Sequence, residues 1–368
     1  DLSGWVNVNC HPDTFFVKDG AIVTTGKPTG FLRTDRQYEN FVLEMDWMHT
    51  NTKEVGNSGL FVWGDPLPAV GTGYTRGIEV QVLVNLEYKD KMGRVTATSH
   101  GDLFSIWGAT CVPDRPHPGG AQRCLPSEYR AKGGGEWNHY KVTANDGVIK
   151  LEVNGKEVSG VSKCNPRKGY LALESEDAEC HFKNIRIKEL PSTNPKPEEV
   201  AKVWEGHVSL FNGLDLTGWK AGEGAWKAGG GILTAAGKHA PIETGKPLGQ
   251  YELTFDWRIP EKSDDKTFGL FIHGAELTLN REGVSAAGTN GTYLGETKME
   301  PLKTPVKPGA WARTTARVDG KTLEVRTNGS VVYEAPVLRA RDHTITFNGG
   351  GGLQIMNVFV RELKEEKK

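Results

Sequence analysis

"YENFVLEMDW" (residues 38–47) and "LGQYELTFDW" (residues 248–257) decide the fold class and show that the chain repeats itself. In both segments apolar and polar side chains alternate, which is typical of a β-strand with one buried face. Short runs such as "GLFVWG" from Gly59 and "IEVQVLV" from Ile78 are built from the same strand-forming residues. No segment outside residues 190–204 keeps a helical period. We therefore expect an all-β protein made of many short strands, as in a two-sheet sandwich or jelly roll.

The two quoted segments belong to an internal repeat. The same offset of 210 residues aligns "FVKDGAIVT" from Phe16 with "WKAGGGILT" from Trp226, and "GLFVWG" from Gly59 with "GLFIHG" from Gly269. Three segments in one register are hard to obtain by chance. The offset falls to about 173 near the end of the chain, because the second copy lacks much of the long middle loop of the first.

This repeat predicts two domains, residues 1–190 and 206–364, with a proline-rich linker at 191–205. The linker region "LPSTNPKPEEVAK" begins at Leu190, contains three prolines and has little apolar content. We expect it to be extended and solvated.

Charge and hydropathy exclude some partners. The chain has 45 basic and 46 acidic residues, so bulk electrostatics do not favour nucleic acid or an anionic membrane. No apolar run approaches the roughly 20 residues that a transmembrane helix needs. The sequence therefore predicts neither a nucleic-acid partner nor a membrane span.

The five cysteines all lie in the first half of the chain, at Cys10, Cys111, Cys124, Cys164 and Cys180. Cys111 and Cys124 bracket a loop rich in proline and glycine that a disulfide would stabilise, and Cys164 and Cys180 could form a second bridge. Free buried thiols are the alternative, and the spacing does not fit a zinc site. We expect the disulfides, and with them an oxidising compartment.

The segment "RGIEVQVLV" carries the first candidate site. On a strand, Glu79 and Gln81 share one face, while Val80 and Val82 point into the core. A polar face without any role is the structural alternative. The neighbouring loops supply Asn57, Ser58, His100 and Asp102, which favours a sugar-sized site.

Several segments together resemble one known family. They are "LFNGLDLTGW" from Leu210, "GNSGLF" from Gly56, "GIEVQVL" from Gly77, "EWNHYKV" from Glu136, "LEVNGKEV" from Leu151 and "FKNIRIKEL" from Phe182. The chain resembles the DUF1080 family, described as 3-keto-disaccharide hydrolases or 3-keto-glucoside lyases/hydratases. The resemblance covers nearly the whole chain in two copies and is stronger in the first. It implies two concanavalin A-like jelly rolls in a protein exported to the periplasm or surface of a bacterium.

The resemblance also implies a chemistry. In a 3-keto sugar, the hydrogen on the carbon next to the carbonyl is acidified; a base removes it, and the glycosidic oxygen leaves by elimination. Water can then add to the enone. Such a site needs a base, an acid and donors that face the enolate.

Glu79 and His100 are the candidates for proton transfer. The candidates for binding an oligosaccharide or glycoside substrate are Asn57, Gln81, Trp63, Trp107, Arg123 and Glu174. A cofactor is not specified by the sequence; a divalent cation, if used, would be held by Glu79, His100 and Asp102.

Two alternatives remain open. An ordinary glycosidase of this fold would need a carboxylate pair, and Glu174 and Glu176 share a strand face. A non-catalytic lectin-like protein would use the same aromatic and amide side chains. In the second copy Glu276 aligns with Glu79, but Thr278 stands in place of Gln81 and no histidine replaces His100. We expect that copy to be degenerate and non-catalytic.

Overall fold

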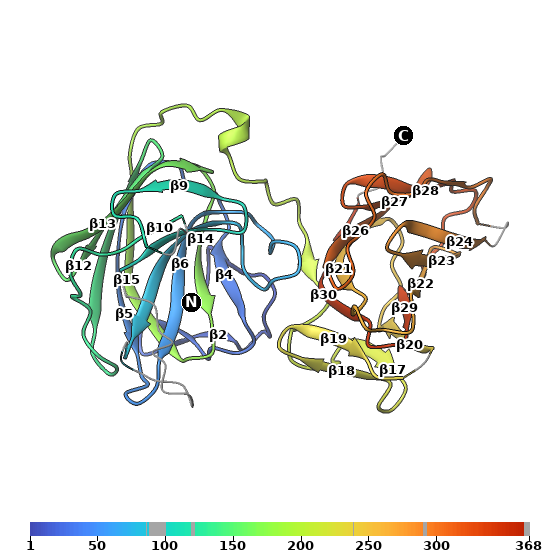
Figure 1. Cartoon of the computed structure of the whole chain (residues 1–368), viewed down its shortest axis with the longest axis horizontal. Coiled ribbons are helices and arrows are strands. Elements are labelled where there is room, and N and C mark those ends of the chain that lie inside the picture. Colours follow the sequence, from blue (N-terminus) through green and yellow to red (C-terminus); the bar gives the residue numbers. More distant parts are fainter. Residues whose placement is uncertain (86, 88–100, 119–121, 238, 290–292, 364–368) are drawn as a thin grey trace. The chain divides into compact units, whose positions relative to one another are not determined.

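A computed structural model describes residues 1–85, 87, 101–118, 122–237, 239–289 and 293–363, and this part is almost entirely β-structure (Figure 1). Two compact units comprise Asp1–Ala69 with Gly73–Trp204, and Val70–Thr72 with Glu205–Lys368. Among the described residues, the one helical element is the 3-10 helix η1 (Pro197–Glu199), and no helix could span a membrane. The predicted all-β fold of two jelly-roll sandwiches is confirmed.

The first unit packs a seven-stranded sheet against an eight-stranded sheet. The seven-stranded sheet contains, in spatial order, β1 (Trp5–Asn7), β4 (Gly30–Thr34), β14 (Tyr170–Ser175), β6 (Gly56–Gly64), β7 (Gly77–Val84), β8 (Leu103–Ile106) and β10 (Arg123–Cys124). The eight-stranded sheet contains β2 (Phe15–Lys18), β3 (Ala21–Thr24), β15 (Cys180–Glu189), β5 (Phe41–His49), β11 (Asn138–Asn145), β12 (Val148–Val153), β13 (Lys156–Asn165) and β9 (Thr110–Pro113).

The second unit repeats this plan with a nine-stranded and a six-stranded sheet. The larger sheet contains β18 (Trp226–Gly229), β19 (Ile232–Ala235), β30 (Gln354–Glu362), β21 (Tyr251–Arg258), β26 (Ala312–Val318), β27 (Thr322–Thr327), β28 (Ser330–Pro336) and β25 (Lys298–Met299), with β16 (Val208–Ser209) beside β30. The smaller contains β17 (Trp219–Ala221), β20 (Ala240–Thr244), β29 (Thr346–Gly349), β22 (Thr267–Ile272), β23 (Ala275–Asn280) and β24 (Gly283–Thr289).

Strand β5 shows how the alternating sequence builds the core. Phe41, Leu43, Met45 and Trp47 are at most 2% exposed, and the residues between them are only partly buried. Burial of each such side chain stabilises the fold by about 1.5–3 kcal/mol. In the second unit β21 takes the same place, and Trp257 is fully buried like Trp47.

The repeat holds strand by strand, with one correction to the predicted register. The hairpin β2–β3 turns at Asp19-Gly20, and β18–β19 turns at Gly230-Gly231. The offset in this hairpin is therefore one residue larger than predicted. Phe15, rather than Phe16, is the buried counterpart of Trp226.

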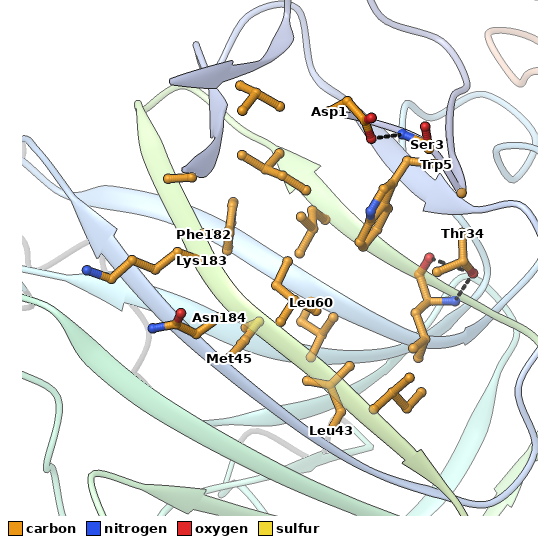
Figure 2. A pocket seen from close by; sticks show the side chains of 18 of the residues that line it. Asp1, Ser3, Trp5, Thr34, Leu43, Met45, Leu60, Phe182, Lys183 and Asn184 are labelled. Carbon is orange, nitrogen blue, oxygen red and sulfur yellow. Dashed lines mark hydrogen bonds between the residues drawn. The ribbon is translucent and has the colours of Figure 1, made fainter. Parts of the chain in front are cut away.

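Figure 2 shows a cavity of about 440 Å³ in the first unit that is lined from both sheets. Its lining combines apolar side chains, such as Leu43, Leu60 and Phe182, with polar ones, such as Asp1 and Lys183. The cavity opens beside the hydrophobic core, and its other polar and aromatic lining residues include Trp5, Thr34 and Tyr38.

The predicted disulfides are wrong, because all five cysteines are free and buried. The thiol of Cys111 lies 3.7 Å from the carbonyl oxygen of Gln122, and that of Cys124 lies 3.4 Å from the carbonyl oxygen of Leu125. The two cysteines belong to strands β9 and β10 of different sheets. The cysteines therefore give no support for an oxidising compartment, and export stays a prediction.

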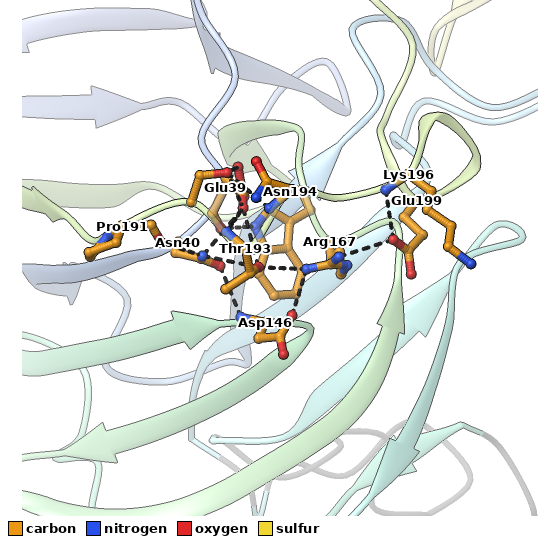
Figure 3. A network of polar contacts seen from close by, with 11 residues as sticks. Glu39, Asn40, Asp146, Arg167, Pro191, Thr193, Asn194, Lys196 and Glu199 are labelled. Carbon is orange, nitrogen blue, oxygen red and sulfur yellow. Dashed lines mark hydrogen bonds and ion pairs between the residues drawn. The ribbon is translucent and has the colours of Figure 1, made fainter.

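Residues 191–194 and 196–198 are exposed, as predicted for the linker, but the segment 190–204 also binds the first unit (Figure 3). Asn40 donates to the carbonyl oxygen of Pro191 at 2.8 Å. Arg167 donates to Thr193 at 2.7 Å and pairs with Glu199 at 3.1 Å. Proline content predicted an extended backbone, but these partners lie far away in the sequence and could not be recognised from composition.

Replacing Arg167 should release this segment. The Arg167 side chain is 12% exposed and holds Asp146, Thr193 and Glu199 together. We expect Arg167→Ala to cost about 1–3 kcal/mol and to speed proteolytic cleavage within residues 191–204, measured by limited proteolysis with mass spectrometry. Lys188→Ala, on an exposed side chain, is the control. Equal cleavage rates in both variants would contradict the role given to Arg167.

Candidate active site

The candidate site lies on the face of the seven-stranded sheet that points away from the sandwich core. Val80 and Val82 of β7 are fully buried in the core. Glu79 and Gln81 therefore occupy the opposite face, as the alternation predicts. Across this face Glu79 pairs with Phe104 of β8, and Phe104 pairs with Arg123 of β10.

A cavity of about 350 Å³ opens on this face. It is lined by Val55, Asn57, Tyr74, Glu79, Gln81, Leu83, Phe104, Ile106, Trp107, Glu174 and Glu176. Three carboxyl groups thus converge on one space. The sequence placed Glu79 and Glu174 in one candidate site and gave Glu174 with Glu176 as the pair of an alternative glycosidase, but it did not place all three glutamates together.

Gly59 of β6 makes this convergence possible. A Cβ atom at Gly59 would lie 2.9 Å from Oε1 of Glu79 and 2.9 Å from Oε2 of Glu174. These distances are shorter than any ordinary contact with a Cβ atom, so a side chain at this position would displace both carboxyl groups. Gly59 lies on β6, between Glu174 of β14 and Gln81 of β7. It pairs with Gln81.

A chain of donors holds the carboxylate of Glu176. The Tyr74 hydroxyl donates to Oε1 of Glu176 at 2.7 Å, and Nδ2 of Asn57 donates to Oε2 at 2.5 Å. Gln81 in turn donates to Oδ1 of Asn57 at 2.6 Å. Two donors to one carboxylate favour its ionised form. Asn57 and Gln81, expected to bind substrate, therefore also orient Glu176.

The other two carboxyl groups favour the neutral form. Burial, reinforced by the negative charge of Glu176, raises the pKa of Glu79 to about 8. Burial and then the charge of Glu79 raise the pKa of Glu174 well above its usual range. Glu174 is 1% exposed, and its Oε2 has no hydrogen-bond partner among the described residues. Burial also raises the pKa of Glu176, but the Tyr74 hydrogen bond opposes that shift.

Tyr74 reaches Glu176 because the loop between β6 and β7 closes on itself. Asp65 and Arg76 at its two ends form an ion pair at 2.9 Å, and Thr75 donates to the carbonyl oxygen of Asp65 at 2.8 Å. Burial, followed by the charge of Glu176, raises the pKa of the Tyr74 hydroxyl, which therefore stays a donor. The sequence gave no periodic signal for Tyr74, since it lies in an irregular loop.

Trp107 flanks the same cavity, as expected. Its side chain is 51% exposed and stacks on Tyr74, with ring centroids 6.3 Å apart and an interplanar angle of 14°. An exposed aromatic surface beside carboxyl groups can pack against the apolar face of a sugar ring.

Trp63 does not belong to the site, and the prediction that it contacts substrate is wrong. Its side chain is fully buried in the core, and its indole N–H donates to the carbonyl oxygen of Glu39 at 2.8 Å. Trp63 has a φ of 58°, so the backbone leaves the extended conformation there. Strand alternation therefore fails to predict the direction of its side chain.

Arg123 and Asp102 form a buried ion pair beside the site. Their side chains are 12% and 0% exposed, and Nε of Arg123 lies 2.5 Å from Oδ2 of Asp102. The Arg123 guanidinium also lies over the ring of Phe104, at 4.6 Å. Because Asp102 is paired with Arg123, it is a poor candidate for the predicted metal ligand. Arg123, a predicted substrate-binding residue, is not among the residues that line the cavity. His100, the other predicted acid or base, lies outside the described residues.

The second unit keeps one of the three carboxyl groups. Glu276 pairs with Phe271 as Glu79 pairs with Phe61. Asn348 pairs with Gly269 and so takes the place of Glu174, one residue beyond the position that the repeat suggested. Gly350 stands two residues later, where the first unit has Glu176. The set of carboxyl groups is therefore specific to the first unit among the residues described.

The raised pKa of Glu79 makes a prediction for stability. Between pH 4.5 and about 8 the folded protein holds a proton on Glu79 that the unfolded chain has lost, so stability falls as the pH rises through this window. Glu79→Gln should therefore raise the thermal midpoint at pH 9, by roughly 2–4 °C per kcal/mol gained, and leave it unchanged at pH 4.5. Calorimetry can measure both. The matched variant Glu276→Gln should not raise the thermal midpoint at pH 9 relative to pH 4.5. If both variants raise the midpoint at pH 9 by the same amount, the raised pKa of Glu79 is not the cause.

Comparisons with known proteins found similar solved structures and one family model. No curated protein matches the chain. A crystal structure of a candidate glycosyl hydrolase from Parabacteroides distasonis is similar, with 21% identity, 52% of this chain and 90% of that chain covered, and a TM-score of 0.40. The carbohydrate-binding module CBM66 of Bacillus subtilis is similar over 39% of this chain and 96% of its own, with 13% identity and a TM-score of 0.31.

A family model described as a 3-keto-alpha-glucoside-1,2-lyase-like domain matches twice, at residues 1–188 and 206–363. The two matches cover both copies of the repeat. The chain belongs to the 3-keto-alpha-glucoside-1,2-lyase-like family, in two tandem copies.

Proposed function

We propose that the first unit cleaves 3-keto-glycosides by elimination and that water then adds to the product, which gives net hydrolysis. The observation that carries this proposal is the unequal set of three carboxyl groups above Gly59. Glu176 accepts two hydrogen bonds, whereas burial favours a proton on Glu79 and on Glu174. One base and one acid in the same cavity are what elimination requires.

In the elimination step Glu176 acts as the base. Its carboxylate takes the proton from C2 of the sugar, and the electron pair of the C2–H bond forms an enolate with the C3 ketone. The C1–O bond then breaks as the C1=C2 double bond forms. The leaving oxygen takes the proton of Glu79, so the aglycone departs as a neutral alcohol.

Hydration reverses both proton transfers. Water adds to C1 of the enone and gives its proton to the Glu79 carboxylate, and C2 takes a proton from Glu176, whose carboxyl proton has exchanged with solvent. The enzyme returns to its starting protonation state, and the net reaction is hydrolysis. This assignment gives the role of acid to Glu79, one of the two proton-transfer candidates from the sequence, and adds Glu176 as the base.

The remaining groups support binding. A protonated Glu174 can donate a hydrogen bond to the enolate oxygen, as a buried neutral carboxylic acid can. Trp107, stacked on Tyr74, offers an aromatic surface to the sugar ring. The second unit retains Glu276 without partners equivalent to Glu174 and Glu176, which supports a non-catalytic role such as glycan binding.

Solvent-isotope labelling distinguishes this mechanism from its alternatives. The purified protein is incubated in D₂O with a 3-keto-glucoside and with the unoxidised glucoside, and the released sugar is analysed by mass spectrometry and NMR. Elimination with hydration predicts cleavage of the keto substrate alone, with one solvent deuterium at C2. Cleavage of the unoxidised glucoside without deuterium at C2 would indicate an ordinary glycosidase. Saturable sugar binding without cleavage would indicate a lectin-like protein.

Variants assign the roles. Glu176→Gln and Glu79→Gln should each lower kcat by about 10²–10⁴-fold, the usual contribution of one proton-transfer group. Glu176→Gln should also abolish exchange at C2, because that step needs only the base. Glu276→Gln in the second unit is the matched control and should keep full activity. Undiminished C2 exchange in Glu176→Gln would contradict the role of base.

A further inference from the structure

Two histidines meet at a second cavity, in the second unit. His273 follows strand β22, and His343 precedes β29; their ring centroids are 5.3 Å apart, at an interplanar angle of 71°. Both line a cavity of about 460 Å³, together with Phe271, Glu276 and Thr346. None of these residues takes part in the proposed chemistry of the first unit.

The first unit shows what these two positions normally contain. His273 corresponds to Trp63, and both residues have positive φ, 45° and 58°. His343 corresponds to Gly169, since the bridge of His343 with Leu248 matches that of Gly169 with Tyr38. In the first unit the Trp63 backbone lies directly against Gly169. At the two positions where the first unit packs Trp63 against Gly169, the second unit therefore has two histidines, His273 and His343.

Three of the four imidazole nitrogens in this pair make no hydrogen bond within the described residues. They are Nδ1 and Nε2 of His273, which is 1% exposed, and Nε2 of His343. The backbone of Arg339 lies close enough to His273 to oppose the lowering of its pKa. A buried polar atom without a partner is destabilising and calls for a ligand, an ion or a water molecule. Three such atoms within one pair of rings point to a shared ligand.

We propose that His273 and His343 bind a divalent transition-metal ion of the zinc type. Imidazole is a preferred ligand for zinc, copper and nickel. Burial, with His343 as the second cause, lowers the pKa of His273, and burial also lowers that of His343, so both rings are neutral and can ligate near pH 7.

The spacing of the rings fits such an ion. A metal–nitrogen distance of about 2.0–2.1 Å places the metal about 3.2 Å from each ring centre, and a tetrahedral angle then separates the centres by about 5 Å. The rings are 5.3 Å apart. The two other coordination positions would face the cavity, where water or a hydroxyl group of a bound molecule could supply them.

Another group of metal-ligating residues in the same unit is less suitable. Glu205, His207 and Glu252 lie close together, but Arg361 pairs with both glutamates, at 2.7 and 2.9 Å. A guanidinium in the group already balances the negative charge that would attract a cation. This group provides the control for the proposed site.

The test is metal titration of the full chain. Zinc is added in competition with a chromophoric chelator, and copper(II) below one equivalent is followed by electron paramagnetic resonance, which reports nitrogen ligands. We expect one saturable ion per chain with two imidazole nitrogens. His273→Gln and His343→Gln should each lower the affinity at least tenfold, whereas His207→Gln should leave it unchanged.

Three outcomes would overturn the proposal. They are the absence of stoichiometric binding, loss of binding only in His207→Gln, and retention of affinity in both His273→Gln and His343→Gln. If either variant fails to fold, the wild-type chain still decides the matter. A copper(II) spectrum of the wild-type chain that lacks two imidazole nitrogen ligands would contradict the site.

Discussion

The close approach of two carboxyl groups over Gly59 is the constraint on which the candidate site depends. A side chain there would meet Glu79 and Glu174 at 2.9 Å. Without one, carboxyl groups from two strands share a space shielded from water, and their mutual repulsion together with burial favours protons on two of them. The donors Tyr74 and Asn57 then favour the charge on Glu176. The proposed difference in protonation state between these glutamates depends on their burial, on the hydrogen bonds to Glu176 and on the absence of a side chain at Gly59.

The duplication separates what holds the fold together from what gives the first unit its chemistry. Trp47 and Trp257 are both fully buried in equivalent strands, so the core side of each sheet has kept its packing. On the opposite face, Glu174 has become Asn348 and the position of Glu176 has become glycine. Side chains on the two faces of a strand are independent of each other, so one face can change without loss of the core.

Alternation and repetition were sufficient to predict the strands, the two domains' common plan and the direction of Glu79 and Gln81. They could not predict Trp63, where a positive φ interrupts the alternation. They also missed the binding of the linker by Asn40 and Arg167, the free state of Cys111 and Cys124, and the hydrogen bond of Tyr74 to Glu176. Each of these depends on contacts between segments far apart in the sequence, which local patterns do not record.

The protonation states of the three glutamates are the central claim, and carbon-13 NMR of the side-chain carboxyl carbons measures them directly. The chain is labelled at glutamate and titrated, with Glu79→Gln, Glu174→Gln and Glu176→Gln used for assignment. At pH 7 we predict protonated carboxyl groups at Glu79 and Glu174 and an ionised carboxylate at Glu176. Ordinary titration of all three near pH 4.5 would contradict the account.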